Sequence, residues 1–153
     1  MNKNRLLHWV ALGFGAGLSP IMPGTAGTLV AVPLYLALSF LPLWAYVLCV
    51  IVGFGFGVWL CGYTARALGV DDDPRIVWDE ITGFWIAMTA IVPTVWNVLF
   101  VFCLFRLFDI WKPWPIRWCD RAIHGGLGIM LDDVLAGIAA SAVFWCVYTI
   151  FRI

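Results

Sequence analysis

Long apolar stretches are the feature that most constrains how this chain can fold. They cover residues 25–40, 43–63, most of 78–111 and about 133–150, and each has or approaches the length that crosses the hydrocarbon core of a bilayer. Hydrophobic residues make up 63% of the 153 residues and charged residues 12%, with a mean hydropathy of +0.97. The sequence therefore predicts an all-α, polytopic membrane helical bundle that forms a single domain over residues 1–153.

The stretch 78–111 allows two interpretations. Val92, Pro93 and Thr94 interrupt it, which fits either one kinked helix or two short antiparallel spans. We favour two spans, because the stretch holds more apolar residues than a single crossing needs. With the other three stretches, this interpretation gives about four spanning helices.

The N-terminus combines a basic tip with an apolar run, which is also the pattern of a cleaved signal peptide. His8 and several glycines interrupt the run. We therefore expect an N-terminal interfacial or re-entrant helix in place of a signal peptide or a further span.

Lysines and arginines indicate how the spans are oriented. The N-terminal basic residues, Arg66, Arg75 and the basic residues of 106–121 all fall on one side of the membrane in the two-span interpretation. The positive-inside rule makes this side cytoplasmic. Arg152 is the exception.

The same topology brings acidic residues to the cytoplasmic ends of the helices. They include Asp79, Glu80, Asp109, Asp132 and Asp133. A carboxylate near the hydrocarbon costs up to about 3 kcal/mol, so these positions need a reason. Helix capping is one possible reason, because we expect Asp79, Glu80, Asp132 and Asp133 to begin helices, and acids in the first turn of a helix complement its dipole.

Spacing favours a second reason. Gly83 follows Asp79 by four residues and Gly137 follows Asp133 by four, so each acid shares a helix face with a glycine that permits close helix contact. Carboxylates at such a contact repel one another unless a cation lies between them. Hard oxygen ligands suit a hard cation, so we predict Mg²⁺. The candidate ligands are Asp79, Glu80, Asp109, Asp132 and Asp133.

A short interfacial helix is expected near residues 115–124. Arg117, Arg121 and His124 follow one another there at helical spacing and would share one face, while neighbouring tryptophans can lie at the membrane surface. Two guanidinium groups at head-group depth would bind a phosphate. Simple anchoring of the protein at the interface is the alternative interpretation.

Two further polar segments have simpler interpretations. Pro23, Gly24 and Thr25 would begin the first spanning helix on the cytoplasmic side, where free backbone amides could bind an anion or Thr25 could act as a plain N-cap. The segment lacks the lysine of a nucleotide-binding loop, which disfavours ATP. The triplet 71–73, three aspartates before Pro74, is typical of a solvated turn.

Carboxylates, a divalent cation and guanidinium groups at a membrane surface together favour phosphoryl chemistry on a lipid head group. The alternative from another class is a small membrane transporter or assembly subunit, but charges in the middle of the spans would then be expected, and the middles carry none. A CDP-alcohol phosphotransferase is an enzymatic alternative whose aspartate-rich helical motif is missing here. No nucleic-acid partner is expected.

Four ordered segments strongly resemble the phosphatidylglycerophosphatase A family. They read GFGAGLSPIMPGTAGTL, VWDEITGFW, FRLFDIWKPWPIRWCDR and HGGLGIMLDDVLAG, and the resemblance runs from about Trp9 to Gly137. It implies a Mg²⁺-dependent phosphatase of the bacterial inner (cytoplasmic) membrane, with its active site facing the cytoplasm, that converts phosphatidylglycerophosphate to phosphatidylglycerol and phosphate. It does not indicate an oligomeric state.

The resemblance also implies a set of site residues. The polar positions carried over are Thr25, Asp79, Glu80, Arg106, Asp109, Lys112, Arg117, Asp120, Arg121, His124, Asp132 and Asp133. The expected catalytic residues are Asp79, Asp133 and His124. The expected ligands of the substrate phosphate are Thr25, Lys112, Arg117 and Arg121. We expect attack by water activated at the metal, with a covalent aspartyl intermediate as the open alternative.

Overall fold

The computed structural model describes residues 3–151, with side chains from Arg5 onward. Arg152, the exception to the charge distribution, lies outside these residues. Within them all regular structure is helical, which confirms the predicted all-α class. The elements are α1 (Lys3–Ala11), the 3₁₀ segment η1 (Gly13–Leu18), α2 (Pro23–Leu38), α3 (Leu43–Leu68), α4 (Trp78–Ala87), α5 (Val95–Trp111), α6 (Ile116–Ala122) and α7 (Gly125–Phe151).

Two helices are long and apolar enough to cross a membrane. They are α3, with 26 residues, and α7, with 27. The apolar helix α2 has 16 residues, and α4 has only 10, which corresponds to about 15 Å of helix against a hydrocarbon core of about 30 Å. Length and composition therefore identify two candidate membrane spans, fewer than the four or so that the sequence predicted.

The stretch 78–111 forms two separate helices, α4 and α5, as we favoured over one kinked helix. The segment 88–94 separates them, with Ala90 in the left-handed region at φ 61° and Pro93 close behind it. Neither residue continues a helix. The division into two is therefore correct, but α4 by itself is too short to be a full crossing.

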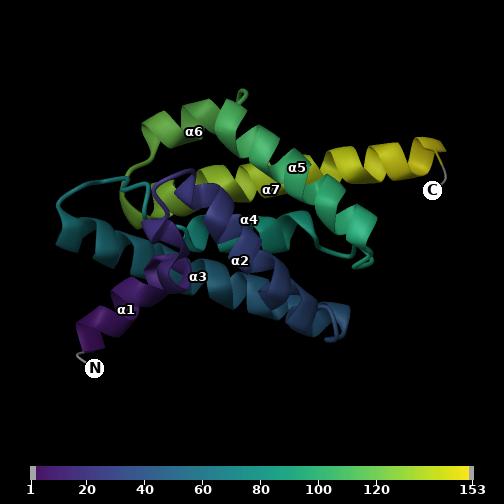
Figure 1. Ribbon diagram of the computed structural model, residues 1–153. Coiled ribbons are helices and arrows are strands. Elements are labelled where there is room, and N and C mark those ends of the chain that lie inside the picture. Colours follow the sequence, from purple (N-terminus) through teal and green to yellow (C-terminus); the bar gives the residue numbers. More distant parts are fainter. Residues whose placement is uncertain (1–2, 152–153) are drawn as a thin grey trace.

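Polar segments gather at one end of the bundle. The loop 69–77, the helix α6 and the first turns of α4 and α7 lie at this end, whereas the segments 39–42 and 88–94 lie at the other (Figure 1). The helix α1 packs on α3, where His8 Nδ1 lies 3.2 Å from Thr64 Oγ1. The N-terminal segment is therefore a short helix followed by a 3₁₀ turn.

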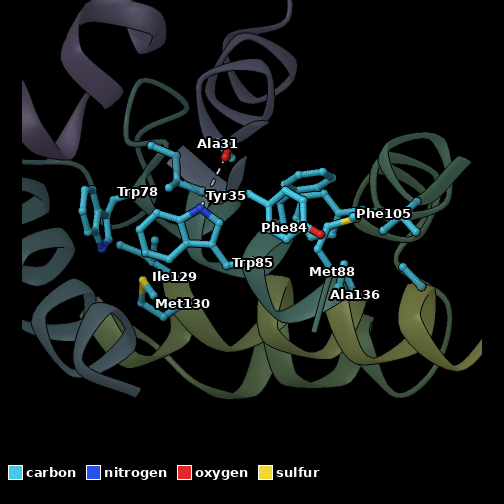
Figure 2. Packing of buried hydrophobic residues seen from close by; sticks show 14 of the residues in the cluster. Ala31, Tyr35, Trp78, Phe84, Trp85, Met88, Phe105, Ile129, Met130 and Ala136 are labelled. Carbon is cyan, nitrogen blue, oxygen red and sulfur yellow. Dashed lines mark hydrogen bonds between the residues drawn. The ribbon is translucent and has the colours of Figure 1, made fainter. Parts of the chain in front are cut away.

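The helix α4 lies at the centre of the hydrophobic core. Ile81 and Phe84 are fully buried, and Phe84 packs edge-on against Tyr35 of α2 and Phe105 of α5. Figure 2 shows these rings together with Trp85, whose indole N–H donates to the Ala31 carbonyl at 3.4 Å. Burying rings of this size dominates the energetics of such a core. Contacts with α2, α3, α5 and α7 therefore fix α4 in position.

Two glycines let α4 and α7 approach closely. A Cβ at Gly83 would lie 2.8 Å from the Asp133 carbonyl oxygen, and a Cβ at Gly137 would collide with the Gly83 carbonyl oxygen. Only glycine fits such a contact, as the small-residue spacing predicted. Asp79 and Asp133 each lie one turn before these glycines, so the crossing places both acids at the same end of the bundle.

Candidate metal centre

Three carboxylates meet where α4 crosses α7. Asp79 and Glu80 come from the first turn of α4, and Asp133 comes from α7. One carboxylate oxygen from each lies within 4.8 Å of the other two. Asp79 is 8% exposed and Asp133 only 2%. We call Asp79, Glu80 and Asp133 the carboxylate trio.

The trio has the donor atoms that a divalent cation requires. Asp79 Oδ1, Glu80 Oε2 and Asp133 Oδ1 are all buried, and none has a hydrogen-bond partner in the described part of the chain. Unpaired buried carboxylates are costly, and three of them together repel one another. A cation bound between them would remove both penalties, and oxygen donors suit a hard ion such as Mg²⁺. The residues present therefore fit a divalent metal.

Helix capping does not explain all three acids. The expectation that Asp132 and Asp133 begin a helix is wrong, because α7 starts at Gly125 and places both about two turns inside it. The dipole effect is confined to the first turn, so it does not reach them. Asp79 and Glu80 do lie in the first turn of α4.

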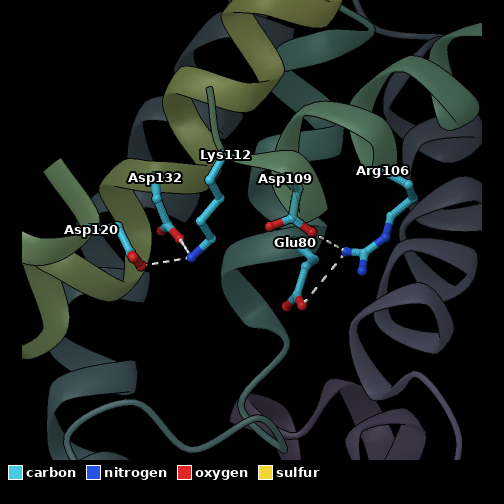
Figure 3. A network of polar contacts seen from close by, with 6 residues as sticks. All are labelled: Glu80, Arg106, Asp109, Lys112, Asp120 and Asp132. Carbon is cyan, nitrogen blue, oxygen red and sulfur yellow. Dashed lines mark hydrogen bonds and ion pairs between the residues drawn. The ribbon is translucent and has the colours of Figure 1, made fainter. Parts of the chain in front are cut away.

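Asp109 and Arg106 form the side of the site nearest α2. The Arg106 guanidinium pairs with Asp109, and its Nη1 lies 3.8 Å from Glu80 Oε1 (Figure 3). Its Nε is buried without a hydrogen-bond partner among the described residues. Asp109 therefore faces a cation within the protein, and the structure does not group it with the trio.

Lys112 lies on the opposite side of the site from Arg106. Its Nζ donates to Asp120 Oδ1 and to Asp132 Oδ2, both at 2.6 Å (Figure 3). Burial by itself would lower the pKa of Lys112, but the two carboxylates outweigh it and raise the pKa above its usual value. The ammonium group therefore stays charged. Asp132 is paired with this lysine and, like Asp109, lies outside the trio.

A cleft of about 460 Å³ joins these groups. Its lining includes the trio, Arg106, Asp109, Lys112, Asp132, Asp72 and the start of α2 from Met22 to Gly24. We call it the acidic cleft. Gly24 lies directly against the Glu80 and Arg106 side chains, since a Cβ there would be 3.0 Å from both terminal nitrogens of Arg106. The first free amides of α2 therefore begin beside the trio.

Thr25 is not the N-cap of α2. The helix begins at Pro23 and its N-cap is Met22, so Thr25 lies in the first turn. The Thr25 hydroxyl is buried and has no hydrogen-bond partner in the described part of the chain. Plain capping by Thr25 is therefore wrong, and anion binding at the start of α2 stays a prediction.

The structure separates the basic residues near α6. Arg117 and Arg121 are exposed and line a second cavity of about 620 Å³, which meets the acidic cleft at Lys112. His124 does not share their face, because α6 ends at Ala122 and Ile123 is extended. It lines a small third cavity of about 50 Å³ together with Asp120 and other acids.

The aspartate triplet is not uniformly solvated. Asp73 is only 4% exposed and accepts hydrogen bonds from Arg75 Nε at 2.8 Å and Nη2 at 2.7 Å. These bonds hold the pKa of Asp73 below its usual value. Asp72 lines the acidic cleft, which sequence reasoning missed because consecutive aspartates before a proline usually form a solvated turn. Asp71 is exposed.

Carboxylates beside a guanidinium and an ammonium group are the side chains that enzymes of phosphoryl chemistry use, so the site defines the class of phosphoryl-handling enzymes. Comparison with known proteins is consistent with this class. Residues 9–148 match the family described as Phosphatidylglycerophosphatase A. The chain belongs to the phosphatidylglycerophosphatase A family, which confirms the resemblance of its four motifs.

Three relatives share most of their length with this chain. Phosphatidylglycerophosphatase A of Escherichia coli K12 is 49% identical over 90% of this chain and 81% of the relative. The protein of the same name from Haemophilus influenzae is 42% identical over 92% and 88%. A putative phosphatidylinositol-3-phosphatase from Bacteroides thetaiotaomicron is 39% identical over 84% and 85%. No solved structure matches the chain.

Proposed function

We propose that this protein hydrolyses the phosphomonoester of phosphatidylglycerophosphate to give phosphatidylglycerol and phosphate, with Mg²⁺ at the carboxylate trio. In this reaction a water oxygen bonds to phosphorus, the phosphorus–oxygen ester bond breaks, and the glycerol oxygen leaves with a proton. Family membership supports the reaction. The observation that supports a metal is the set of buried carboxylate oxygens that lack hydrogen-bond partners among the described residues.

The carboxylate trio and its basic neighbours have different roles in the proposed reaction. Bound by Asp79, Glu80 and Asp133, Mg²⁺ would offset charge on the phosphoryl group and lower the pKa of water. Arg106 and Lys112 line the same cleft and would hold phosphoryl oxygens. Asp120 and Asp132 accept hydrogen bonds from the Lys112 ammonium group, which keep it charged and fix its position. The acid–base role of His124 stays a prediction.

The names of the relatives suggest which part of the lipid matters. One is named for phosphatidylglycerophosphate and another for a phosphatidylinositol 3-phosphate. Both lipids carry a phosphodiester next to the diacylglycerol and a phosphomonoester on a polyol. We propose that the substrate class is defined by these two phosphates, with the polyol between them as the variable part.

We propose further that the protein lies in the bacterial inner membrane with the acidic cleft facing the cytoplasm. Two candidate spans and the basic residues at the cleft end of the bundle support this orientation. Single cysteines placed in 69–77 or 112–124 of a cysteine-free variant should resist an impermeant thiol reagent applied from outside. Labelling of these positions from outside would overturn the orientation.

The direct test is phosphate release from phosphatidylglycerophosphate by the purified protein, with and without Mg²⁺. We expect release only with Mg²⁺, and a loss of at least about a hundredfold in Asp79→Asn and Asp133→Asn, because an amide is a weaker ligand that offsets no charge. Both variants must remain folded in detergent. Near-normal release by both would contradict the metal assignment, because loss of a charged ligand would then have no effect.

A further inference from the structure

The largest of the cavities described lies outside the acidic cleft, along α6. Its lining consists of Trp111, Lys112, Pro113, Trp114, Arg117, Trp118, Arg121 and Ala122. Its volume of about 620 Å³ is within the range of small-molecule sites. We call it the basic groove. It carries cationic groups and aromatic walls but no acid, whereas the acidic cleft carries six carboxylates.

The two arginines of the basic groove are available to bind an anion. Arg117 and Arg121 are four residues apart on α6, so their side chains neighbour each other. Both are exposed, and neither forms an ion pair within residues 5–151. Two guanidinium groups in this arrangement can hold the oxygens of one phosphate through charge-assisted hydrogen bonds.

The walls of the groove fit a lipid head group. Trp114 is 84% exposed, Trp111 63% and Trp118 61%. Tryptophan rings exposed to this degree beside arginines are typical of the membrane–water interface, where an apolar ring meets the acyl region and cations meet phosphate. A lipid held here would have its phosphate at the arginines and its diacylglycerol part toward the rings.

The basic groove and the acidic cleft meet at one residue. Lys112 lines both cavities, and its Nζ lies between Asp120 and Asp132. A ligand could therefore extend from one cavity into the other past this lysine. The proposed substrate has two phosphates separated by a single glycerol, so its two binding sites must be adjacent. The basic groove is the adjacent cationic site.

We infer that the basic groove binds the phosphodiester of the substrate lipid while the acidic cleft holds its terminal phosphomonoester, an assignment that rests on the proposed function. The groove thereby selects lipids with a second phosphate and fixes the monoester beside the carboxylate trio. This replaces the expectation that Arg117 and Arg121 hold the phosphomonoester itself, since both lie outside the lining of the cleft.

The test uses inhibitors that each carry one of the two groups. Phosphatidylglycerol has the phosphodiester alone, and phosphatidic acid has a phosphomonoester joined directly to diacylglycerol. Both would be added to the protein in a nonionic detergent, with phosphatidylglycerophosphate as substrate. In Arg117→Gln and Arg121→Gln we expect KM for the substrate and Ki for phosphatidylglycerol to rise at least about tenfold each. The Ki for phosphatidic acid should change much less.

A matched control is Arg66→Gln, which removes an exposed arginine from the last turn of α3 at the same end of the bundle. It should leave KM and both Ki values unchanged. Unchanged KM in both groove variants would overturn the inference, as would a parallel rise of both Ki values, because the arginines would then attract any anionic lipid. A wild-type protein that releases no phosphate from the substrate would contradict the proposed function instead.

Discussion

Asp132 and Asp133 are neighbours in the chain, but their carboxylates belong to different parts of the site. Asp133 contributes to the carboxylate trio, while Asp132 accepts a hydrogen bond from Lys112 Nζ at 2.6 Å. Consecutive residues of a helix point about 100° apart, which sends the two side chains to different neighbours. One acid is therefore a candidate metal ligand, and the other positions a lysine.

This separation predicts different defects in two isosteric variants. Asp133→Asn should raise the Mg²⁺ concentration needed for half-maximal phosphate release by about tenfold or more, because a ligand loses its charge. Asp132→Asn should leave that concentration nearly unchanged and raise KM for the lipid, because Lys112 loses one of its two carboxylate partners. A Mg²⁺ titration at saturating lipid measures the first quantity, and a lipid titration at saturating Mg²⁺ measures KM. An equal rise of the half-maximal Mg²⁺ concentration in both variants would contradict the separation of the two acids.

The close packing around Gly24 predicts that a larger residue there would impair activity through a steric clash alone. A Cβ at this position would press on the Glu80 carboxylate and on both terminal nitrogens of Arg106. Gly24→Ala should therefore displace this pair and reduce phosphate release at least about tenfold while the helices stay folded. The control is Gly55→Ala on an exposed face of α3, where a Cβ meets nothing within 4 Å. Alanine there should leave activity intact, and equal activity in both variants would refute the spatial argument.

The sequence predicted that Asp79 and Asp133 lie close together because the signal was local. Asp79 with Gly83 and Asp133 with Gly137 each mark one helix face, and the two faces do meet. The helical class likewise followed from continuous apolar stretches. Periodicity within one element is visible in a sequence, so a contact between two such faces could be anticipated.

The rest of the site depends on where helices end. An extended Ile123 removes His124 from the face of α6, and Gly125 starts α7 two turns before Asp133. Element boundaries are the least reliable part of sequence reasoning, because tertiary contacts decide them. The placement of Asp72 at the acidic cleft is a long-range contact of a loop, which no local pattern reports.

Asp73 predicts a pH-dependent contribution to stability. Its hydrogen bonds from Arg75 lower its pKa in the folded protein, so the folded state holds the charged form more tightly than the unfolded state does. The stabilisation is therefore present above the ordinary aspartate pKa of about 4 and is lost as pH falls through the lowered value. Thermal unfolding in detergent should show Asp73→Asn less stable than wild type at pH 7, with the difference shrinking toward pH 3.

The matched variant is Asp71→Asn, which changes an exposed aspartate of the same triplet. It should show no difference from wild type at either pH, because no ion pair or hydrogen bond of Asp71 is lost among the described residues. A pH-independent deficit in Asp73→Asn would mean that packing, and not the charge, accounts for its effect.

A conservative substitution of Arg106 should reduce turnover without unfolding the protein. Its guanidinium is buried between Glu80 and Asp109, so a neutral replacement would leave both acids unpaired and threaten the fold. Arg106→Lys keeps the charge but loses the fork that can hold two phosphoryl oxygens. We expect it to remain folded, with kcat reduced about tenfold or more if this fork holds the phosphoryl group. Arg75→Lys, which alters an arginine outside the cleft, should keep its turnover. Full turnover by Arg106→Lys would leave Arg106 only the role of balancing the charges of Glu80 and Asp109.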